Sequence, residues 1–433
     1  MTSSDLVCRE NEWLLEFIEQ RRKSARRTMP TKIEQTVSGI IKRVNTIGDK
    51  ALVDYTRWFD KLELNPSEFR ISKEEISSAY SKVSKKQISA LKEMISRIKR
   101  VAERTLEGVS FSMDIDGTQI IQTFRPLSEI GCYVPGGEAA YPSSLIMCAV
   151  PALVAGVSRI VVCTPPKIEG VNPLILIAAD MCNIEEIYQI GGPQAIIAMA
   201  FGTYTIQPVQ KIVGPGNAFV AQAKRMILDR TLIDMPAGPS ELLVIADDTA
   251  SAKNIALDLI SQAEHSRDAI SILLSPSEKL CDEVITLLRE LIPKSNREQI
   301  VRDSLHQNGG IFVCKSISEC IQLANDFAPE HIEIVTENAK ELAELITSAG
   351  LILLGDYTPV SASDYCLGVN HVLPTQGYAS IYSGLSVLDF IRIVRIAETN
   401  KEALENISDT ICTLAEAEGL LDHAKAIKGR FER

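Results

Sequence analysis

The sequence is poor in histidine and tryptophan and has no close pair of cysteines. Its 433 residues include only 5 His and 2 Trp, and the 10 Cys form no CxxC or CxxxC pair. A cysteine zinc clip or a CxxC redox couple is therefore excluded, and we expect the thiols to stay reduced. Because histidine is so scarce, the position of each one is informative.

Positive charge is also in short supply. Lys and Arg number 45 against 56 Asp and Glu, which gives a net charge of -11. Such a balance argues against nucleic acid or an anionic membrane as the main partner. No run of 18 uncharged apolar residues occurs, and the start, MTSSDLVCRENEWLLEF, has no basic segment followed by an apolar run. We therefore expect a cytoplasmic enzyme that acts on a small molecule.

The chain contains two kinds of segment, charged helical stretches at its ends and short apolar strand-like runs between them. The first 110 residues are charged and helical in pattern, and the segment after Asp389, ETNKEALENISDTICTLAEAEGLLDHAKAIKGRFER, again predicts charged helix. Between them, short β-branched runs such as SRIVVCTPP, SELLVIADD and HIEIVT alternate with small-residue helical stretches. This pattern predicts an α/β fold with two parallel sheets covered by helices, plus small helical pieces at both ends.

Two successive segments read as strand, glycine-rich turn and helix. They are IYQIGGPQAIIAMA and QKIVGPGNAFVAQAK, and the sequence YVPGG precedes both. Glycines let a backbone approach a phosphate, and the helix N-terminus offers free N–H groups to it. Neither turn has the full GxGxxG fingerprint, and a single glycine turn can serve tight packing alone. Their succession favours a nucleotide site.

The stretch SQAEHS ends a helix whose apolar stripe should not contain polar groups. Gln262 and His265 continue the face of Ile255 and Leu259. An unpartnered buried amide costs about 1–3 kcal/mol, so these side chains should bind something. A metal ion is one candidate, and a hydrogen-bonded helix end is the plainer alternative. Asp364 and His423 could complete a set of N and O donors that suits zinc.

The remaining histidines allow similar alternatives. Glu330 and His331, in APEHIEI, precede a predicted strand just after a proline, as an acid/base pair or as a solvated, capped turn. His306 is expected in a polar surface loop. Cys163, at the end of a strand run, could be a nucleophile but is better explained as a buried core residue.

Several long motifs, in order, resemble those of the histidinol dehydrogenase family. They are DMPAGPSELLVIAD, SQAEH, APEHIEI, SDYCLGVNHVLP and LAEAEGL followed by the His423 segment, and the similarity runs from about residue 28 to the C-terminus. The resemblance implies a zinc-dependent homodimer with two incomplete Rossmann-like domains. It implies oxidation of L-histidinol to L-histidine by two hydride transfers to NAD, through a bound aldehyde.

The resemblance also implies a role for individual residues. The zinc ligands would be Gln262, His265, Asp364 and His423, with His423 and Glu418 supplied by the partner chain. Glu330 and His331 would be the acid/base pair: His331 would take the hydroxyl proton and Glu330 would activate water. Substrate would contact Ser240, Gln262, His265, His331, Asp364, Glu418 and His423, with His371 nearby, and NAD would contact Tyr133, Gln194 and Asn217.

The expected domains follow from the same resemblance. Residues 1–27 would form an N-terminal helical piece, and residues 28–133 with 241–385 a first Rossmann-like domain that carries the metal and acid/base residues. Residues 134–240 would form the second, NAD-side domain. Residues 386–433 would form a C-terminal helical piece that contributes to the partner's site.

A few positions depart from the family pattern. Pro193 stands in the GGPQAI turn, where a first-turn proline is harmless, while Cys366, Leu367 and Val369 add bulk to a loop that borders the expected metal site. A related dehydrogenase for another small polar alcohol, such as a sulfonated diol, therefore remains an alternative. A non-catalytic zinc-stabilised dimer or nucleotide-binding module is another, although Glu330 and His331 are both retained.

Overall fold

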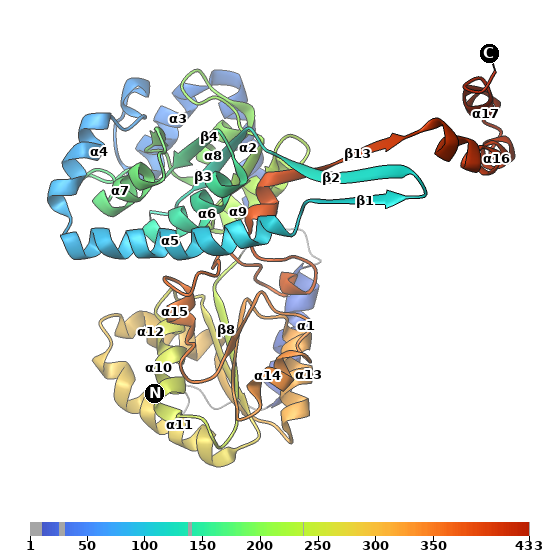
Figure 1. The fold of residues 1–433 in the computed structure, drawn as a ribbon. Helices are drawn as coiled ribbons and strands as arrows, with labels where there is room; N and C mark the ends of the chain where they lie inside the picture. Colours follow the sequence, from blue (N-terminus) through green and yellow to red (C-terminus); the bar gives the residue numbers. More distant parts are fainter. Residues whose placement is uncertain (1–10, 26–30, 137–140, 237, 433) are drawn as a thin grey trace.

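The structure is a computed structural model that describes residues 11–25, 31–136, 141–236 and 238–432. Two lobes, each built around one parallel sheet, lie one above the other in Figure 1. A long arm leaves the upper lobe and ends in two helices close to the C-terminus. The α/β class with parallel sheets, predicted from the sequence, is confirmed.

The upper lobe contains a five-stranded parallel sheet in the order β5-β4-β3-β6-β7. Its strands are β3 (Glu129–Tyr133), β4 (Arg159–Cys163), β5 (Glu186–Tyr188), β6 (Lys211–Val213) and β7 (Leu232–Ile233). The helices between them are α6 (Pro142–Ala155), α7 (Pro173–Met181), α8 (Gly192–Phe201) and α9 (Ala218–Met226). Most residues of β3 to β6 are buried, as expected where helices cover both faces of a sheet.

The lower lobe contains a second five-stranded parallel sheet in the order β10-β9-β8-β11-β12. Its strands are β8 (Glu241–Ala246), β9 (Ile270–Ser275), β10 (Gly309–Val313), β11 (His331–Val335) and β12 (Leu351–Leu354). Its helices are α10 (Ala252–Ala263), α11 (Glu278–Leu291), α12 (Glu298–Asn308), α13 (Ile317–Phe327), α14 (Ala339–Ala343) and α15 (Val360–Ser363). In both sheets the first strand lies in the centre and the fourth strand pairs with it, so the two lobes share one topology.

The N-terminal helices pack on both lobes. α1 (Asn11–Ala25) packs on the lower lobe, where Leu14 and Ile18 join the core of β8 to β11. By contrast α2 (Thr31–Ile47), α3 (Asp49–Tyr55), α4 (Lys73–Ala79) and α5 (Lys85–Glu107) share cores with the upper sheet. The predicted domain boundaries joined residues 28–133 to the lower sheet, and they stay a prediction. In the structure, α2 to α5 pack on the upper sheet instead.

The arm differs from the sequence prediction. It is a three-stranded sheet of β1 (Phe111–Ile115), β2 (Thr118–Pro126) and β13 (Ile391–Thr399), followed by α16 (Lys401–Ala417) and α17 (Leu421–Lys428). The helices were predicted, but the C-terminal piece was expected to be helical throughout, and β13 corrects that. The hydrophobic pattern does not reveal this strand, because β13 pairs with a strand far away in the sequence and most of its side chains are exposed.

The structure also bears on the predictions for Cys163, His306 and membrane-spanning helices. Cys163 ends β4 and is fully buried, which confirms the core interpretation. Burial raises the pKa of its thiol, so it is a poor nucleophile. His306 lies on α12 and not in a loop, although it is exposed as expected. Within the described ranges, no helix combines the length and hydropathy that a bilayer span requires.

Candidate functional site

Gln262 stands in the last turn of α10, on the face that Ile255 and Leu259 bury, and His265 follows two residues after the helix ends. Gln262 is 1% exposed, and its amide nitrogen has no hydrogen-bond partner within the part of the chain that the structure describes. His265 Nδ1 lies 3.2 Å from the carbonyl oxygen of Ser261. A carbonyl only accepts, so Nδ1 carries the proton and Nε2 offers a lone pair. This second contact is typical of a histidine that binds a metal through Nε2.

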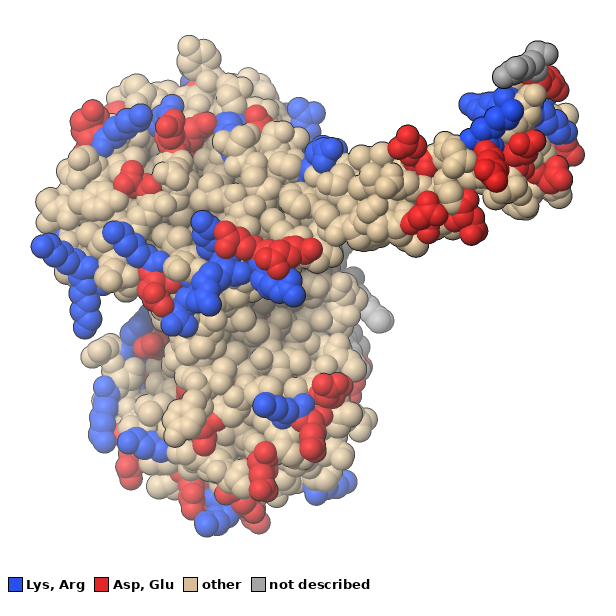
Figure 2. Space-filling model, viewed as in Figure 1, with Lys and Arg blue, Asp and Glu red and all other residues tan. Residues whose placement is uncertain are grey.

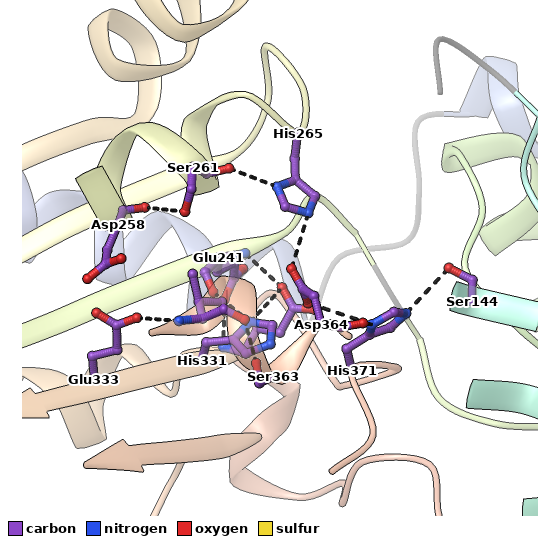
Figure 3. A network of polar contacts seen from close by, with 12 residues as sticks. Ser144, Glu241, Asp258, Ser261, His265, His331, Glu333, Ser363, Asp364 and His371 are labelled. Carbon is purple, nitrogen blue, oxygen red and sulfur yellow. Dashed lines mark hydrogen bonds and ion pairs between the residues drawn. The ribbon is translucent and has the colours of Figure 1, made fainter. Parts of the chain in front are cut away.

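Asp364 approaches His265 from another element. It follows α15 as its C-cap residue, and its Oδ2 lies 3.8 Å from His265 Nε2. Two ligands of one zinc ion stand a few ångströms apart, because each bond is about 2.0–2.2 Å long. His265 Nε2 and the carboxylate of Asp364 are therefore close enough that both could bind one cation. Figure 3 shows the two groups facing one another.

Glu330 and His331 stand where β11 begins. The preceding helix α13 ends at Phe327, and Ala328 takes a left-handed conformation before Pro329, as the proline led us to expect. Both side chains are buried, and Glu330 Oε2 lies 3.7 Å from His331 Nδ1. The alternative of a solvated turn is wrong, because these groups are enclosed.

The proton on His331 can be placed from its contacts. Its Nδ1 lies 3.3 Å from the carbonyl oxygen of Glu241, which only accepts, so Nδ1 is the protonated nitrogen. In the neutral ring Nε2 is then the unprotonated nitrogen, and it is enclosed without a partner in the described residues. Burial by itself lowers the pKa of His331, but the carboxylates of Glu330 and Asp364 outweigh it and raise the pKa. The arrangement is that of a general base with a free Nε2.

Glu241 is a site residue that the sequence reasoning missed. It begins β8, is fully buried, and its Oε1 accepts a hydrogen bond of 2.7 Å from the backbone N–H of Gln376. Its backbone N–H donates to Glu330 Oε2 at 2.7 Å, and its Oε2 accepts from the Glu330 N–H at 3.3 Å. These contacts orient the Glu330 carboxylate. The available signal was a glutamate at the start of a run, ELLVIA, that is otherwise apolar.

His371 connects this group with the upper lobe. Its Nδ1 lies 3.0 Å from the carbonyl oxygen of Asp364, and its Nε2 lies 3.4 Å from Ser144 Oγ on α6. Burial lowers the pKa of His371 despite the neighbouring carboxylate, which favours the neutral ring. In Figure 3 His371 stands between Asp364 and Ser144, so the start of α6 faces the polar cluster.

The glycine turns of the upper lobe have the predicted structure. β5 leads through Gly191 into α8, and β6 leads through Gly214 into α9. Tyr133 ends the central strand β3, and its hydroxyl accepts a hydrogen bond of 3.0 Å from the Gly192 N–H. Burial raises the pKa of Tyr133 to about 12, which keeps the phenol neutral. The turns thus meet at the carboxyl ends of the strands, where open α/β sheets bind ligands.

Gly214 has a structural reason to be glycine. Its φ is +112°, and a Cβ there would lie 2.2 Å from the backbone oxygen of Tyr133. The buried ion pair of Lys224 and Asp234, 2.7 Å long, holds the turn in place. Lys224 donates to the Gly214 oxygen and Asp234 accepts from the Gly214 N–H, so both backbone groups are satisfied.

The other predicted contact residues fall on both lobes. Asn217 is the exposed N-cap of α9, and Gln194 lies buried in the first turns of α8 with an amide oxygen that has no partner among the described residues. Pro193 occupies the first turn of α8, as expected. Ser240 directly precedes β8, at the same edge as Glu330 and His331, and is half-buried. All of these stand at the edges where the two lobes present their turns.

Glu418 and His423 are not brought to this cluster. Glu418 caps α16 and His423 lies in α17, both are exposed, and in Figure 1 these helices lie at the far end of the arm. Across the described ranges, no three His, Cys, Asp or Glu side chains gather closely enough to hold a metal ion. One chain therefore brings together Gln262, His265 and Asp364, but not the fourth predicted ligand.

Comparison with known proteins agrees with this architecture. The family model for histidinol dehydrogenase matches residues 22–431. The chain belongs to this family. It is 47% identical to histidinol dehydrogenase of Clostridium acetobutylicum over 402 residues, which cover 93% of each chain. It is 42% identical to that of Methanosarcina mazei over 401 residues, or 92% of each chain. A crystal structure of histidinol dehydrogenase from Elizabethkingia anophelis superimposes with a TM-score of 0.89 at 39% identity, covering 94% of this chain and 93% of that one. This membership makes the chain an oxidoreductase.

Proposed function

We propose that this protein oxidises L-histidinol to L-histidine in two hydride transfers to NAD, and that it requires zinc. The proposal places the enzyme in histidine biosynthesis in the cytoplasm. The observation that carries it is the enclosed Nε2 of His331, which has no partner in the described residues, beside the Glu330 carboxylate and at the same sheet edge as His265 and Asp364. A base, a second carboxylate and a cation site are what a two-step alcohol oxidation needs.

The donor groups fit zinc. Gln262, His265 and Asp364 offer one amide, one imidazole and one carboxylate, a mixed N and O set that suits this ion. Gln262 would bind the ion through its amide oxygen, because the amide nitrogen, which has no partner in the described chain, can only donate. When bound there, zinc would supply a Lewis acid that could hold the substrate and fix its carbinol carbon beside these residues.

The chain's own residues divide the proton transfers between them. In the first oxidation the carbinol carbon loses hydride to NAD, and His331 Nε2 accepts the hydroxyl proton. Glu330 then removes a proton from water as it adds to the aldehyde, and the resulting hydrate loses a second hydride to another NAD. Ser240, half-buried beside β8, lies where it can contact the substrate. NAD would lie on Tyr133, Gln194 and Asn217, at the turns of the upper sheet.

We further propose that the enzyme is a homodimer in which the arm of one subunit completes the site of the other. Glu418 and His423 are exposed at the end of the arm, while the described residues hold no group of three His, Cys, Asp or Glu side chains that could bind a metal ion by itself. The arm sheet also exposes large apolar side chains, among them Phe111, Met113 and Ile393. Figure 2 shows the arm projecting from the body with broad uncharged areas along it. Exposed apolar surface of this extent is typical of an interface.

A substrate other than histidinol is the second candidate, and a specific observation supports it. Leu367 is 39% exposed and follows Asp364 by three residues, so its bulk can border the substrate. A sulfonated diol or a similar small polar alcohol would then replace histidinol. Glu418 and His423 favour the imidazole-bearing substrate.

The test of the function is the stoichiometry of the reaction. Purified protein with zinc, NAD and L-histidinol should yield about two NADH per histidine formed, as two hydride transfers require. One NADH with release of the aldehyde would overturn the two-step proposal. Turnover of a sulfonated diol in preference to histidinol would favour the second candidate. Absence of NADH with every alcohol would favour a non-catalytic role.

The shared site is tested by mixing inactive subunits. His331→Asn and His423→Asn subunits are unfolded, mixed in equal amounts and refolded. Each hybrid dimer then has one site with an intact body and an intact arm. Random pairing makes about half the dimers hybrid, so roughly a quarter of wild-type activity should return. A mixture as inactive as its parents would show that each arm serves its own body.

A further inference from the structure

One buried carboxylate beside the site has no part in the proton transfers. Glu333 is 1% exposed and lies two residues after His331 on β11, so both side chains project from the same face of the sheet. Its Oε1 accepts a hydrogen bond of 2.6 Å from the backbone N–H of Val360. Its Oε2 is enclosed without a partner in the described residues. In Figure 3 a dashed line joins the Glu333 carboxylate to a nitrogen in the central polar group.

The contact leads to a predicted metal ligand. Val360 is the first residue of α15, whose opening N–H groups have no partner inside the helix. The Val360 carbonyl in turn accepts hydrogen bonds from the Asp364 N–H at 3.1 Å and from Ser363 Oγ at 2.7 Å. α15 is a single turn, so whatever fixes its first residue also fixes Asp364 at its end.

The same carboxylate also faces the helix that carries the other ligands. Asp258 stands on α10 one turn before Gln262, and burial together with the Asp258 charge raises the pKa of Glu333 to about 8. Burial and the charge of Asp356 likewise raise the pKa of Asp258 to about 7. These acids do not form a second cation site, since no cluster that could hold a metal ion occurs among the described residues. From β11, which also carries His331, Glu333 therefore faces both α10 with Gln262 and α15, which Asp364 caps.

We propose that Glu333 is a positioning residue of the zinc site: its hydrogen bond to the start of α15 sets the place of Asp364 relative to α10. The inference rests on the proposed zinc-dependent function. Residues that orient metal ligands without touching the metal change its affinity by about 10–100-fold when they are lost. A residue that served packing alone would change the stability of the protein and leave zinc affinity as it was.

The test measures zinc binding by the metal-free, full-length protein in competition with a chromophoric chelator. Glu333→Ala removes the acceptor and should weaken zinc binding about 10–100-fold. Glu333→Gln keeps an oxygen that can accept from Val360 and should recover most of the affinity. Glu337→Ala, an exposed glutamate just beyond the same strand, is the control and should match wild type. The KM for NAD should stay unchanged in all three variants.

Thermal unfolding of the same metal-free samples separates positioning from packing. A lower Tm for Glu333→Ala with wild-type zinc affinity would overturn the inference. If that variant does not fold, Glu333→Asp decides, because its shorter side chain cannot reach Val360: weakened zinc binding supports the inference and unchanged binding overturns it. The proposed function fails separately, if the wild-type protein neither binds zinc nor oxidises histidinol.

Discussion

The two parallel sheets have the same strand order and use opposite edges. In the upper sheet, Tyr133, Gly191 and Gly214 stand where strands or their turns end, at the carboxyl edge. In the lower sheet, Ser240 precedes β8 and Glu330 precedes β11, at the amino edge. The contact of His371 with Asp364 and Ser144 lies where these two edges meet.

The two edges offer different groups to a ligand, backbone N–H groups on the upper sheet and side chains on the lower sheet. The carboxyl edge of the upper sheet offers backbone N–H groups, glycine turns and helix N-termini, which bind phosphates whatever the neighbouring side chains are. The amino edge of the lower sheet offers side chains with defined protonation, held by buried hydrogen bonds such as those of Glu241. We therefore expect substitutions on the lower edge to affect metal and proton transfer, and those on the upper edge to affect NAD.

The largest effect should come from removing a metal ligand. His265→Asn, or treatment of wild type with a chelator, should reduce turnover to background while NAD still binds, because the glycine turns lie on the other lobe. Zinc content measured on the purified variant checks the loss of the metal, and calorimetry checks that NAD still binds. Equal loss of NAD binding would show that the two edges do not act separately.

Substitutions in the acid/base pair should show the next largest effect, and each should affect a different one of the two oxidation steps. His331→Asn should slow oxidation of the alcohol by about a hundredfold to ten-thousandfold, the usual contribution of a positioned base. Glu330→Gln should chiefly slow oxidation of supplied L-histidinaldehyde, because only that step consumes water. Rapid-mixing measurements of NADH formation from each substrate follow the two steps. Equal losses in both steps for both variants would contradict the division of roles.

On the upper edge, Gly214→Ala should weaken NAD binding with little effect on zinc. The new Cβ would meet the Tyr133 oxygen, and the strain of a few kcal/mol should raise the KM for NAD about tenfold or more. Gly355→Ala is a matched control, since Gly355 also has positive φ, of +80°, but nothing lies within 4 Å of its added Cβ. A Gly355 variant with the same rise in KM would show that the clash with Tyr133 is not the cause.

Much of this site was visible in the sequence because its signals are local. Gln262 and His265 interrupt a helical stripe, and the pair Glu330 and His331 follows a helix-ending proline, so spacing alone placed them at element ends. Their gathering at one edge depends on parallel pairing, in which β11 lies beside β8. Asp364 was only a candidate to complete the donor set, since no local pattern connects it with α10, and the resemblance to a family then implied it as a ligand.

The sequence did not predict groups whose role depends on non-local contacts. Glu241 and Glu333 look like ordinary strand residues until the fold places the Glu330 and Val360 N–H groups beside them. The strand β13 of the arm was not predicted, for a related reason. β13 pairs with β2 and exposes side chains such as Ile393 and Ile396, so it lacks the buried face that makes a strand recognisable.

The smallest expected effect is a shift in pH dependence within the lower edge. His331 must be neutral to accept a proton, so the first oxidation should be lost as pH falls through its pKa. Because Glu330 and Asp364 raise that pKa, the loss should begin at a higher pH than for an ordinary histidine. Glu330→Gln removes one of the two charges, so His331 should lose its proton more easily and the acid limb should move to lower pH. The measurement is the single-turnover rate of the first hydride transfer against pH, because the variant is slow in the second. Glu337→Gln, exposed beyond the same strand, should leave the limb in place. An acid limb that does not move in Glu330→Gln would mean that a group other than His331 controls it.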